Sequence, residues 1–477
     1  MVKRGRSKVV DDAELLPHDT KREKRSDSKV GILNLKAASP EQAELSTIPV
    51  LYSQAVHLKI WAIANKALLY TSPPSLFPEY TEPGGSGYVY RDAAFWTSGF
   101  FPGSLYLLLE RMRKHSHILR QACEANTSLP HVLSVEFACR WWTENLHTNA
   151  TLLGTHDLGF LVMPWARPAV EMLNDARSLQ TIVTAARTLA ARFDARVGCL
   201  RSWDVCETKV YSFSDTSKDF LVIIDNMMNL DLLFYAASKT NDVTLYETAR
   251  SHALKSQQAH VRSDFSTTHV INFDPTTGKI KQRLTNQGMA HESCWSRGQA
   301  WAIAGFVETF LWTREETFLD TARGCADYFL RRLPASKIPP WDFDASAQSC
   351  QPPDTSAAMI AAYGMLLIHK ALVSRGERQS PYLVYALQIA EAVCKEHMNQ
   401  PASGKKVYEE VKTVEKDIGV KEVRLEVSIG SGDTILNGAT INNFEHAPRR
   451  WANHGLVYAD YYFMLFGNKL LELGFLP

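Results

Sequence analysis

The chain has 477 residues, and 52 basic against 51 acidic side chains leave a formal net charge of +1. That balance argues against a nucleic-acid-binding protein, which should carry a basic stripe or patch. No apolar run approaches the roughly eighteen residues expected of a membrane span, and the eight cysteines include no CxxC pair. We therefore expect a reduced, cytoplasmic protein that has no disulfide framework or zinc cluster and contacts neither nucleic acid nor membrane.

Residues 1–45 are rich in charge and poor in aromatic residues, which is typical of a disordered tail. From residue 46 to residue 477, apolar residues recur three and four positions apart, so we predict one domain made of successive helices. The predicted helices cover Val50–Tyr70, Phe101–Lys114, His131–Leu146, Ala176–Phe193, Phe220–Lys239, Val243–Val261, Arg297–Trp312, Glu316–Leu333, Ser356–Val373, Pro381–His397 and Trp451–Leu473. Strand signals are few and lie at His269–Phe273 and, as a hairpin, within Lys405–Val427.

The number and similar length of these helices predict an all-α fold. About eleven helices in one chain are far above the helical base rate. Helix pairs repeated along a chain form either an open solenoid or a closed toroid. The sequence has no fixed-period repeat of the kind that open superhelices carry, so we favour a closed double ring of helical hairpins, with residues 405–427 as a small β-hairpin insertion.

One stretch, Leu221–Ala237, carries acidic and amide residues inside an otherwise apolar pattern. Its spacing predicts a helix buried nearly all round, with Asp225, Asn226 and Asn229 together on one surface. A carboxylate in such a segment must be paired, hydrogen-bonded or shifted in pKa, because burying a bare charge is very costly. By itself, the pattern leaves Asp225 as either a helix cap or a functional carboxylate.

Three loops before this stretch combine aromatic and polar residues, and such loops often carry function. Trp96 precedes a Pro-Gly turn and is either a sugar-stacking platform or part of the core. His156 and Asp157 are adjacent in a short polar loop, where Asp157 is either an ordinary cap or a second active-site carboxylate. Trp203 is followed by an aspartate, and this pair is explained equally well by a functional loop or by a solvated loop with one packed ring.

A fourth region, His269–Trp301, holds a glutamine, an arginine and several rings. Arg297 and Trp301 are four residues apart, so they share one face near the start of a helix. This helix end attracts anions and the Arg297 guanidinium matches a carboxylate, although a structural salt bridge also explains the arginine. A fifth loop contains Asp354, for which we favour capping of the next helix.

Taken together, these loops resemble the unsaturated glucuronyl hydrolases of glycoside hydrolase family 88. Any single motif would be weak, but the ordered set is specific and spans most of the chain after residue 50. The matching motifs are Phe95–Gly103, His156–Phe160, Ile224–Leu230, Asn286–Gly288, Trp295–Trp301 and Asp354–Ala358. The resemblance implies an (α/α)6 barrel, which agrees with the helix count.

The resemblance also implies a reaction and a site. Family members remove a 4,5-unsaturated uronic acid from the non-reducing end of oligosaccharides by hydrating its double bond, without a metal or organic cofactor. It implies that Asp225 is the general acid/base and that Asp157 is a second essential aspartate. The substrate-contacting residues that it implies are Trp96, His156, Trp203, His269, Gln287, Arg297 and Trp301.

Three departures from the family pattern leave substrate choice more open than reaction type. Ser296 replaces a usual alanine, the loop Leu436–Asn442 lacks a tyrosine that members often place near the site, and the hairpin insertion is atypical. The alternatives are an unsaturated rhamnogalacturonyl hydrolase, a diverged relative that acts on a small natural product, and a non-catalytic helical scaffold. The discriminator for the scaffold is whether Asp157 and Asp225 face a common solvent-reaching cavity, and the enzyme hypothesis fails if they point apart.

Overall fold

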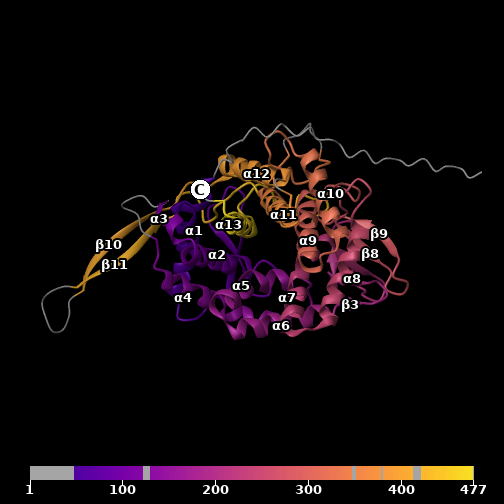
Figure 1. Ribbon diagram of the computed structural model, residues 1–477, viewed down its shortest axis with the longest axis horizontal. Coiled ribbons are helices and arrows are strands. Elements are labelled where there is room, and N and C mark those ends of the chain that lie inside the picture. Colours follow the sequence, from indigo (N-terminus) through magenta and orange to yellow (C-terminus); the bar gives the residue numbers. More distant parts are fainter. Residues whose placement is uncertain (1–47, 122–128, 346–350, 378–379, 412–419, 476–477) are drawn as a thin grey trace, which may run out of the picture. The chain divides into compact units, whose positions relative to one another are not determined.

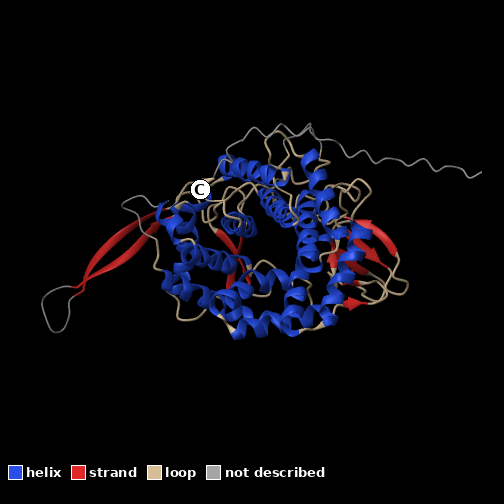
Figure 2. Ribbon diagram, in the orientation of Figure 1, coloured by secondary structure: helices blue, strands red, loops and turns tan. Residues whose placement is uncertain are grey.

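Helices dominate the computed structural model, which describes residues 48–121, 129–345, 351–377, 380–411 and 420–475 (Figure 2). The prediction of a mainly helical fold is confirmed, whereas the predicted disordered tail lies outside the described residues. The α-helices of the described part are α1 (Gln54–Leu68), α2 (Phe100–Lys114), α3 (Ser116–Gln121), α4 (Val132–Thr143), α5 (Leu158–Leu173), α6 (Ala176–Ala190), α7 (Leu230–Thr240), α8 (Val243–His260), α9 (Ser296–Thr313), α10 (Glu316–Arg332), α11 (Thr355–Ser374), α12 (Pro381–His397) and α13 (Val457–Glu472).

Six of these helices contact one another in a closed cycle. In chain order α2, α5, α7, α9, α11 and α13 each pack against the next, and α13 packs against α2 (Figure 1). The intervening helices pack against members of this cycle: α4 on α2, α6 on α5, α8 on α7, α10 on α9 and α12 on α11. Successive helices therefore pair, which is the arrangement that the repeated apolar spacing predicts.

Helix α11 lies within the core. By length and composition it meets the test for a membrane span, which the sequence analysis did not anticipate, but 89% of that window is buried inside the protein. A helix that is apolar all round suits the centre of a large soluble fold as well as a bilayer. Asp354 accepts hydrogen bonds from the N–H groups of Ser356 and Ala357, so the predicted cap of this helix is confirmed.

Two α-helices, α3 and α5, are missing from the predicted set, and α5 is the longer of them. It contains Pro164 and Pro168, residues that normally interrupt a helix because they lack an N–H group and clash with the preceding turn. Its first nine residues are nonetheless buried, and burial against α2, α6 and α7 outweighs local propensity. A left-handed Asn174 ends the helix. Most other predicted boundaries agree within two or three residues, although α13 begins at Val457 rather than Trp451.

The prediction of one helix over Phe220–Lys239 is wrong. The segment begins as strand β7 (Phe220–Ile223), turns through the 3-10 helix η3 (Ile224–Asn229), and becomes helical only at Leu230. Strand β7 pairs with β8 (Val270–Phe273), which lies between β7 and β9 in a three-stranded sheet. The run of branched apolar residues fits this buried sheet better than a helix. Asp225 therefore stands where a strand ends.

The remaining strands form small antiparallel pairs. The predicted hairpin is confirmed as β10 and β11, and the predicted strand at 269–273 is confirmed as β8. Two further 3-10 helices, η1 and η2, precede α1 and follow α4. The bounds are β1 (Leu76–Thr81), β2 (Tyr88–Asp92), β3 (Phe193–Asp194), β4 (Cys199–Leu200), β5 (Cys206–Glu207), β6 (Ser212–Phe213), β9 (Ile280–Leu284), β10 (Ser403–Val411), β11 (Val420–Ser428), η1 (Pro49–Tyr52) and η2 (Glu144–Thr151).

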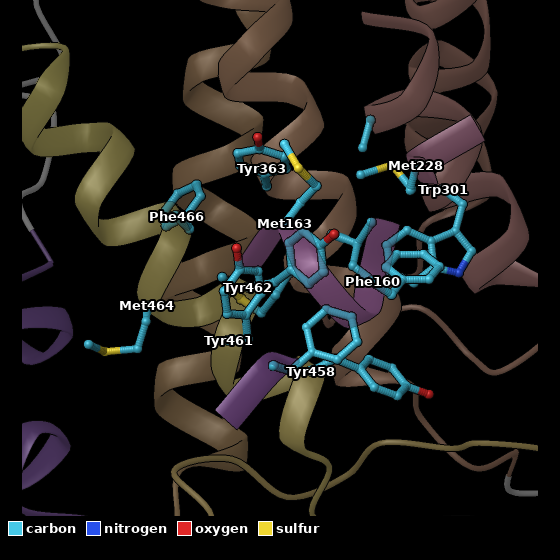
Figure 3. Packing of buried hydrophobic residues seen from close by; sticks show 14 of the residues in the cluster. Phe160, Met163, Met228, Trp301, Tyr363, Tyr458, Tyr461, Tyr462, Met464 and Phe466 are labelled. Atoms are coloured by element: carbon cyan, nitrogen blue, oxygen red, sulfur yellow. The ribbon is translucent and has the colours of Figure 1, made fainter. Parts of the chain in front are cut away.

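Aromatic side chains from four helices of the cycle meet in the core. Phe160 of α5 packs against Trp301 of α9 with 5.2 Å between ring centroids, and Trp301 packs against Tyr462 of α13. Tyr363 of α11 contacts the same Tyr462 (Figure 3). Such tilted and edge-on ring pairs are favourable beyond the area that they bury. This cluster holds the ends of α5, α9 and α13 in fixed relation.

Candidate active site

A cavity of about 360 Å³ opens among the loops that precede these helices. It is lined by charged, amide and aromatic residues, which is the mixture expected of a site for a polar, ring-shaped ligand. Six tryptophan or other aromatic rings and five acidic or basic side chains belong to its wall. The lining residues are Glu79, Arg91, Phe95, Trp96, His156, Asp157, Trp203, Ile223, Asp225, Asn286, Gln287, Trp295, Arg297, Trp301, Ile441 and Trp451.

Asp157 and Asp225 both face this cavity and share one histidine. His156 Nε2 lies 3.3 Å from Asp225 Oδ1 and 3.3 Å from Asp157 Oδ1. The other ring nitrogen, Nδ1, lies 3.0 Å from the carbonyl oxygen of Ser202 and must donate to it, because a carbonyl only accepts. The imidazole is fully buried, whereas the Asp225 side chain is 16% exposed, so a ligand reaches the carboxylate but not the ring.

The surroundings shift the pKa values of two members of this triad. Burial raises the pKa of Asp225 above its ordinary value, and the hydrogen bond and charge of His156 offset only part of that rise. Burial opposes charge on His156 as well, but the Asp157 and Asp225 carboxylates outweigh it and raise the pKa of the imidazole. The site thus holds a carboxyl group that is easier to protonate than usual beside an imidazole that is also easier to protonate than usual, which suits proton transfer.

Ser202 connects the loops that carry the triad. Its hydroxyl accepts hydrogen bonds from the Ile223 N–H, at 3.0 Å, and from Asn226 Nδ2, at 3.3 Å, while its carbonyl binds His156. Asn226 also donates to the carbonyl of Leu200. The sequence predicts that Asp225 and its neighbouring amides share one surface. In the structure, Asn226 instead turns inward and holds the 200–202 segment.

A close approach between α5 and η3 brings Asp157 near Asp225. Asn229 Oδ1 accepts the N–H of Phe160 in the first turn of α5. A Cβ atom on Gly159 would lie 2.6 Å from Asn229 Oδ1 and 2.7 Å from its Cα, so only glycine permits this contact. No side-chain cap bond is made by Asp157 or within η3, which removes helix capping as the role of either aspartate.

The three tryptophans predicted to contact the substrate, Trp96, Trp203 and Trp301, all line the cavity. Trp96 packs against Phe160 and Tyr458, with ring centroids 5.6 and 5.1 Å apart, and stays partly exposed. Trp203 is also partly exposed, whereas Trp301 is 1% exposed and offers little surface to a ligand. Trp96 and Trp203 are therefore the better placed of the three to contact a ligand, and Trp96 both packs against the core and lines the cavity.

Arg297 lies in the wall of the cavity but is engaged by the protein. Its Nη1 donates to Asp354 Oδ2, at 2.7 Å, and to the carbonyl of Thr440, and its Nη2 donates to the carbonyl of Ile441. Gln287 Nε2 also donates to Ile441. The structural salt bridge considered from sequence is thus present, and the arginine fixes the 440–441 segment that forms part of the wall.

His269 is not among the lining residues. It is 3% exposed and stands behind Trp295, with 4.4 Å between ring centroids. Its Nδ1 accepts the N–H of Asn286, and burial keeps the pKa of the imidazole well below its ordinary value. A neutral, enclosed histidine of this kind supports the loop that carries Asn286 and Gln287 rather than touching a ligand directly.

Sequence reasoning missed several lining residues on the opposite wall. Glu79 and Arg91 form an ion pair across β1 and β2, with 2.5 Å between Oε2 and Nε. Burial raises the pKa of Glu79, and Arg91 offsets part of that effect. These strands were not predicted at all. Trp451 lies in a segment predicted as helix, whereas Phe95, Asn286 and Trp295 fall inside motifs that the sequence analysis singled out without assigning them a role.

The donor set of the cavity does not indicate a metal ion. Within the described residues, no group of three or more histidine, cysteine, aspartate or glutamate side chains is arranged to hold one. In the Asp225–His156–Asp157 triad, His156 instead forms a hydrogen bond with Asp225 and lies at ion-pair distance from Asp157. Proton transfer to and from a bound ligand is the chemistry that these residues support.

Comparison with curated proteins identifies relatives of one kind. The chain is 32% identical over 312 residues to an unsaturated chondroitin disaccharide hydrolase of Streptococcus agalactiae, which covers 65% of this chain and 72% of the relative. It is 32% identical over 304 residues to an unsaturated glucuronyl hydrolase of Bacillus sp., which covers 64% of this chain and 74% of the relative. The alignment with an unsaturated glucuronyl hydrolase of Formosa agariphila spans slightly less of that protein, 66% of its length at 32% identity. No protein-family model matches the sequence.

Solved structures give the same result over more of the chain. An unsaturated glucuronyl hydrolase specific for heparin superposes with a TM-score of 0.69 at 26% identity, covering 89% of this chain and 97% of the other. The Bacillus sp. GL1 enzyme superposes with a TM-score of 0.67, with the same coverage of each chain, at 24% identity. The chain belongs to the unsaturated glucuronyl hydrolase family.

Proposed function

We propose that the protein removes a 4,5-unsaturated uronic acid from the non-reducing end of short oligosaccharides. The observation that carries the proposal is the pair of carboxylates, Asp157 and Asp225, that face one cavity and share His156. The family's curated relatives, which are named for unsaturated glucuronyl and chondroitin disaccharide substrates, support this substrate class. A common cavity also counts against a purely structural role for the two aspartates.

In the proposed reaction, water adds across the C4=C5 bond of the uronate. Asp225, whose raised pKa favours its protonated form, donates a proton to C4 and then accepts one from the water that attacks C5. The product is a hemiketal at C5, which opens and releases the rest of the oligosaccharide. Protonated His156 stabilises the Asp225 carboxylate after it has given up its proton. Asp157 holds the sugar hydroxyls from the other side of the imidazole.

Two broader assignments belong with this proposal. The closed cycle of helix contacts, together with its partnered outer helices, supports an (α/α)6 barrel. A cytoplasmic location belongs to the same proposal and stays a prediction. Both fit an enzyme that takes up small lyase products after they enter the cell.

The test is the substitution Asp225→Asn, assayed by the loss of ultraviolet absorbance of the conjugated double bond in an unsaturated uronyl disaccharide. We expect kcat/KM to fall by about 10²–10⁴-fold, the usual contribution of a general acid/base. Asp215→Asn is the matched control, because Asp215 is exposed and lies outside the cavity. An Asp225→Asn enzyme within a few-fold of wild type contradicts the proposal.

Substrate choice needs a second measurement. Turnover should be compared across unsaturated glucuronyl disaccharides, with and without sulfate, and unsaturated galacturonyl-rhamnose. Faster turnover of the rhamnose conjugate identifies a rhamnogalacturonyl hydrolase instead. No turnover of any unsaturated uronide by the folded protein favours a diverged relative that acts on another small molecule.

A further inference from the structure

The Asp225 carboxylate depends on its backbone for its direction. Among the described residues, His156 is the only hydrogen-bond partner of this carboxylate, at 3.3 Å. The path of the chain from Ile224 to Asn226 therefore decides where the carboxylate points. A displacement of about 1 Å at a reacting group can cost about 10²-fold in rate. Whatever fixes this stretch of backbone thus acts on the proposed reaction.

Two segments hold the residues that flank Asp225. The Ile224 N–H donates to the carbonyl oxygen of His269, at 3.1 Å. Asn226 Nδ2 donates to the carbonyl oxygen of Leu200, at 3.4 Å. The first segment leads into β8 and the second contains the end of β4. Both strands are short, so their positions depend on what packs behind them.

Helix α8 packs behind both segments. It contacts β4, β8 and η3 (Figure 1). His252, Ser256 and His260 follow one another along it at four-residue spacing, so they lie on one side of the helix. All three are buried. Burying polar groups is costly unless they are hydrogen-bonded, so a polar stripe on a buried helix side indicates a specific set of contacts.

Each of the two histidines binds the backbone of one segment. Nδ1 of His252 accepts the N–H of Leu200, at 3.0 Å. Nδ1 of His260 lies 2.9 Å from the carbonyl oxygen of Thr268 and donates to it, because a carbonyl only accepts. The Thr268 N–H donates in return to the carbonyl oxygen of His260, at 2.8 Å. Both contacts fall on, or next to, the residue whose carbonyl holds a neighbour of Asp225.

We propose that His252 and His260 are positioning residues, which act through the backbone of the 200 and 268–269 segments to aim Asp225 at the substrate. Neither histidine lines the cavity, so neither touches a ligand. The effect on turnover rests on the proposed function, whereas the placement of Asp225 can be measured without a substrate.

Both histidines are neutral near neutral pH. Burial, together with the nearby imidazoles of His260 and His156, lowers the pKa of His252 to about 3. Burial also lowers the pKa of His260 to about 4, although the bond to Thr268 offsets part of that effect. A neutral replacement at either position therefore leaves the charge around Asp225 unchanged. Any change in rate that it causes reflects geometry.

The test compares leucine with asparagine at each position in the full-length protein, with turnover of an unsaturated uronyl disaccharide as the assay. Asparagine keeps the hydrogen bond, because its Oδ1 can accept in place of His252 and its Nδ2 can donate in place of His260. Leucine keeps only bulk. We expect kcat of His252→Leu and His260→Leu to fall by about 10–100-fold with KM within about threefold, and kcat of both asparagine variants to stay within about fivefold of wild type.

His369→Leu is the matched control. His369 is also a buried histidine, but it lies about 20 Å along α11 from the end that Asp354 caps, where Arg297 is bound. Its replacement should leave kcat near wild type, whatever its effect on Tm. Where circular dichroism shows that a leucine variant does not fold, methionine takes its place, since this flexible side chain fills the space without a strong hydrogen bond.

Crystal structures of the variants test the positioning without turnover. We expect the distance from Asp225 Oδ1 to His156 Nε2 to exceed its present 3.3 Å in the leucine variants and to return in the asparagine variants. An unmoved Asp225 overturns the proposal, and so do equal losses of kcat in the leucine and asparagine variants. A wild type that turns over no unsaturated uronide refutes the proposed function, and the measured distances then decide the positioning by themselves.

Discussion

His156 binds the carbonyl of Ser202 through one ring nitrogen and presents the other to Asp225, at 3.3 Å from Oδ1. The same nitrogen lies 3.3 Å from Asp157. A single buried imidazole therefore contacts two carboxylates that face the cavity. Burial raises the pKa of Asp225, whereas His156 lowers it. Substitution of Asp225 therefore affects stability by removing a charge that burial disfavours, and substitution of His156 affects the pH dependence of turnover by letting the pKa of Asp225 rise further.

Asp225→Asn should stabilise the protein at neutral pH. The pKa of Asp225 is higher in the folded than in the unfolded state, so its contribution to stability is present below the unfolded value and is lost as the pH rises through the folded value. At neutral pH the wild type therefore keeps a charge that burial disfavours. We expect Tm at pH 7 to rise by about 1–2 °C, with no rise near pH 3. A lower Tm at pH 7 contradicts this explanation.

His156→Gln should move the pH profile of turnover. Without the imidazole, Asp225 loses the hydrogen bond and the charge that lower its pKa, so the carboxyl stays protonated to higher pH. We expect the alkaline limb of kcat/KM to shift upward, while the maximum rate falls by about 10–100-fold because the carboxylate is no longer stabilised. His117→Gln is the control, since His117 is exposed. An unchanged alkaline limb would show that His156 does not tune Asp225.

Gly159→Ala should separate the two aspartates. A Cβ at this position meets Asn229 atoms at 2.6 and 2.7 Å, so the first turn of α5 must move away from η3. We expect kcat/KM to fall by at least about tenfold and the free energy of unfolding to fall by about 1–3 kcal/mol, as in overpacked cores. At Gly154 nothing lies within 4 Å of an added Cβ, so Gly154→Ala should leave both quantities near wild type.

Ser202→Ala should reduce turnover more than substrate binding. Ser202 does not line the cavity, but its hydroxyl accepts hydrogen bonds from the Ile223 N–H and from Asn226, which flank Asp225. The variant leaves a buried donor unsatisfied, at a cost of about 1–3 kcal/mol. We expect kcat to fall by about tenfold with KM within about twofold, and the alkaline limb to shift. Ser238→Ala removes a hydroxyl distant from the site and serves as control; equal losses in both variants would mean general destabilisation.

Local sequence patterns were sufficient to predict the elements in which buried residues recur at a single regular spacing. Helices such as α10 and α12 show apolar residues at helical spacing, and their ends agree with the prediction within one residue. The hairpin β10–β11 alternates in the way a two-faced strand does. The Asp354 cap was predictable for the same reason, because a cap is fixed by neighbours in sequence.

Elements decided by distant partners were mispredicted. Phe220–Ile223 is a strand because β8, some fifty residues later, supplies its hydrogen bonds. Helix α5 tolerates Pro164 and Pro168 because its neighbours bury it. In both cases the energy of tertiary packing exceeds the local preference, which is usually below about 1 kcal/mol a residue for ordinary residues.

The candidate site divides in the same way. The sequence alone was enough to single out Asp157, Asp225 and the motifs around them, because their residue types and order match a family. Only the tertiary structure shows that His156 lies between both carboxylates. It also shows that Arg297 donates hydrogen bonds to Asp354 and to the 440–441 carbonyls, and that His269 lies behind Trp295. Those roles depend on distances between segments far apart in the chain, and folding rather than sequence order sets such distances.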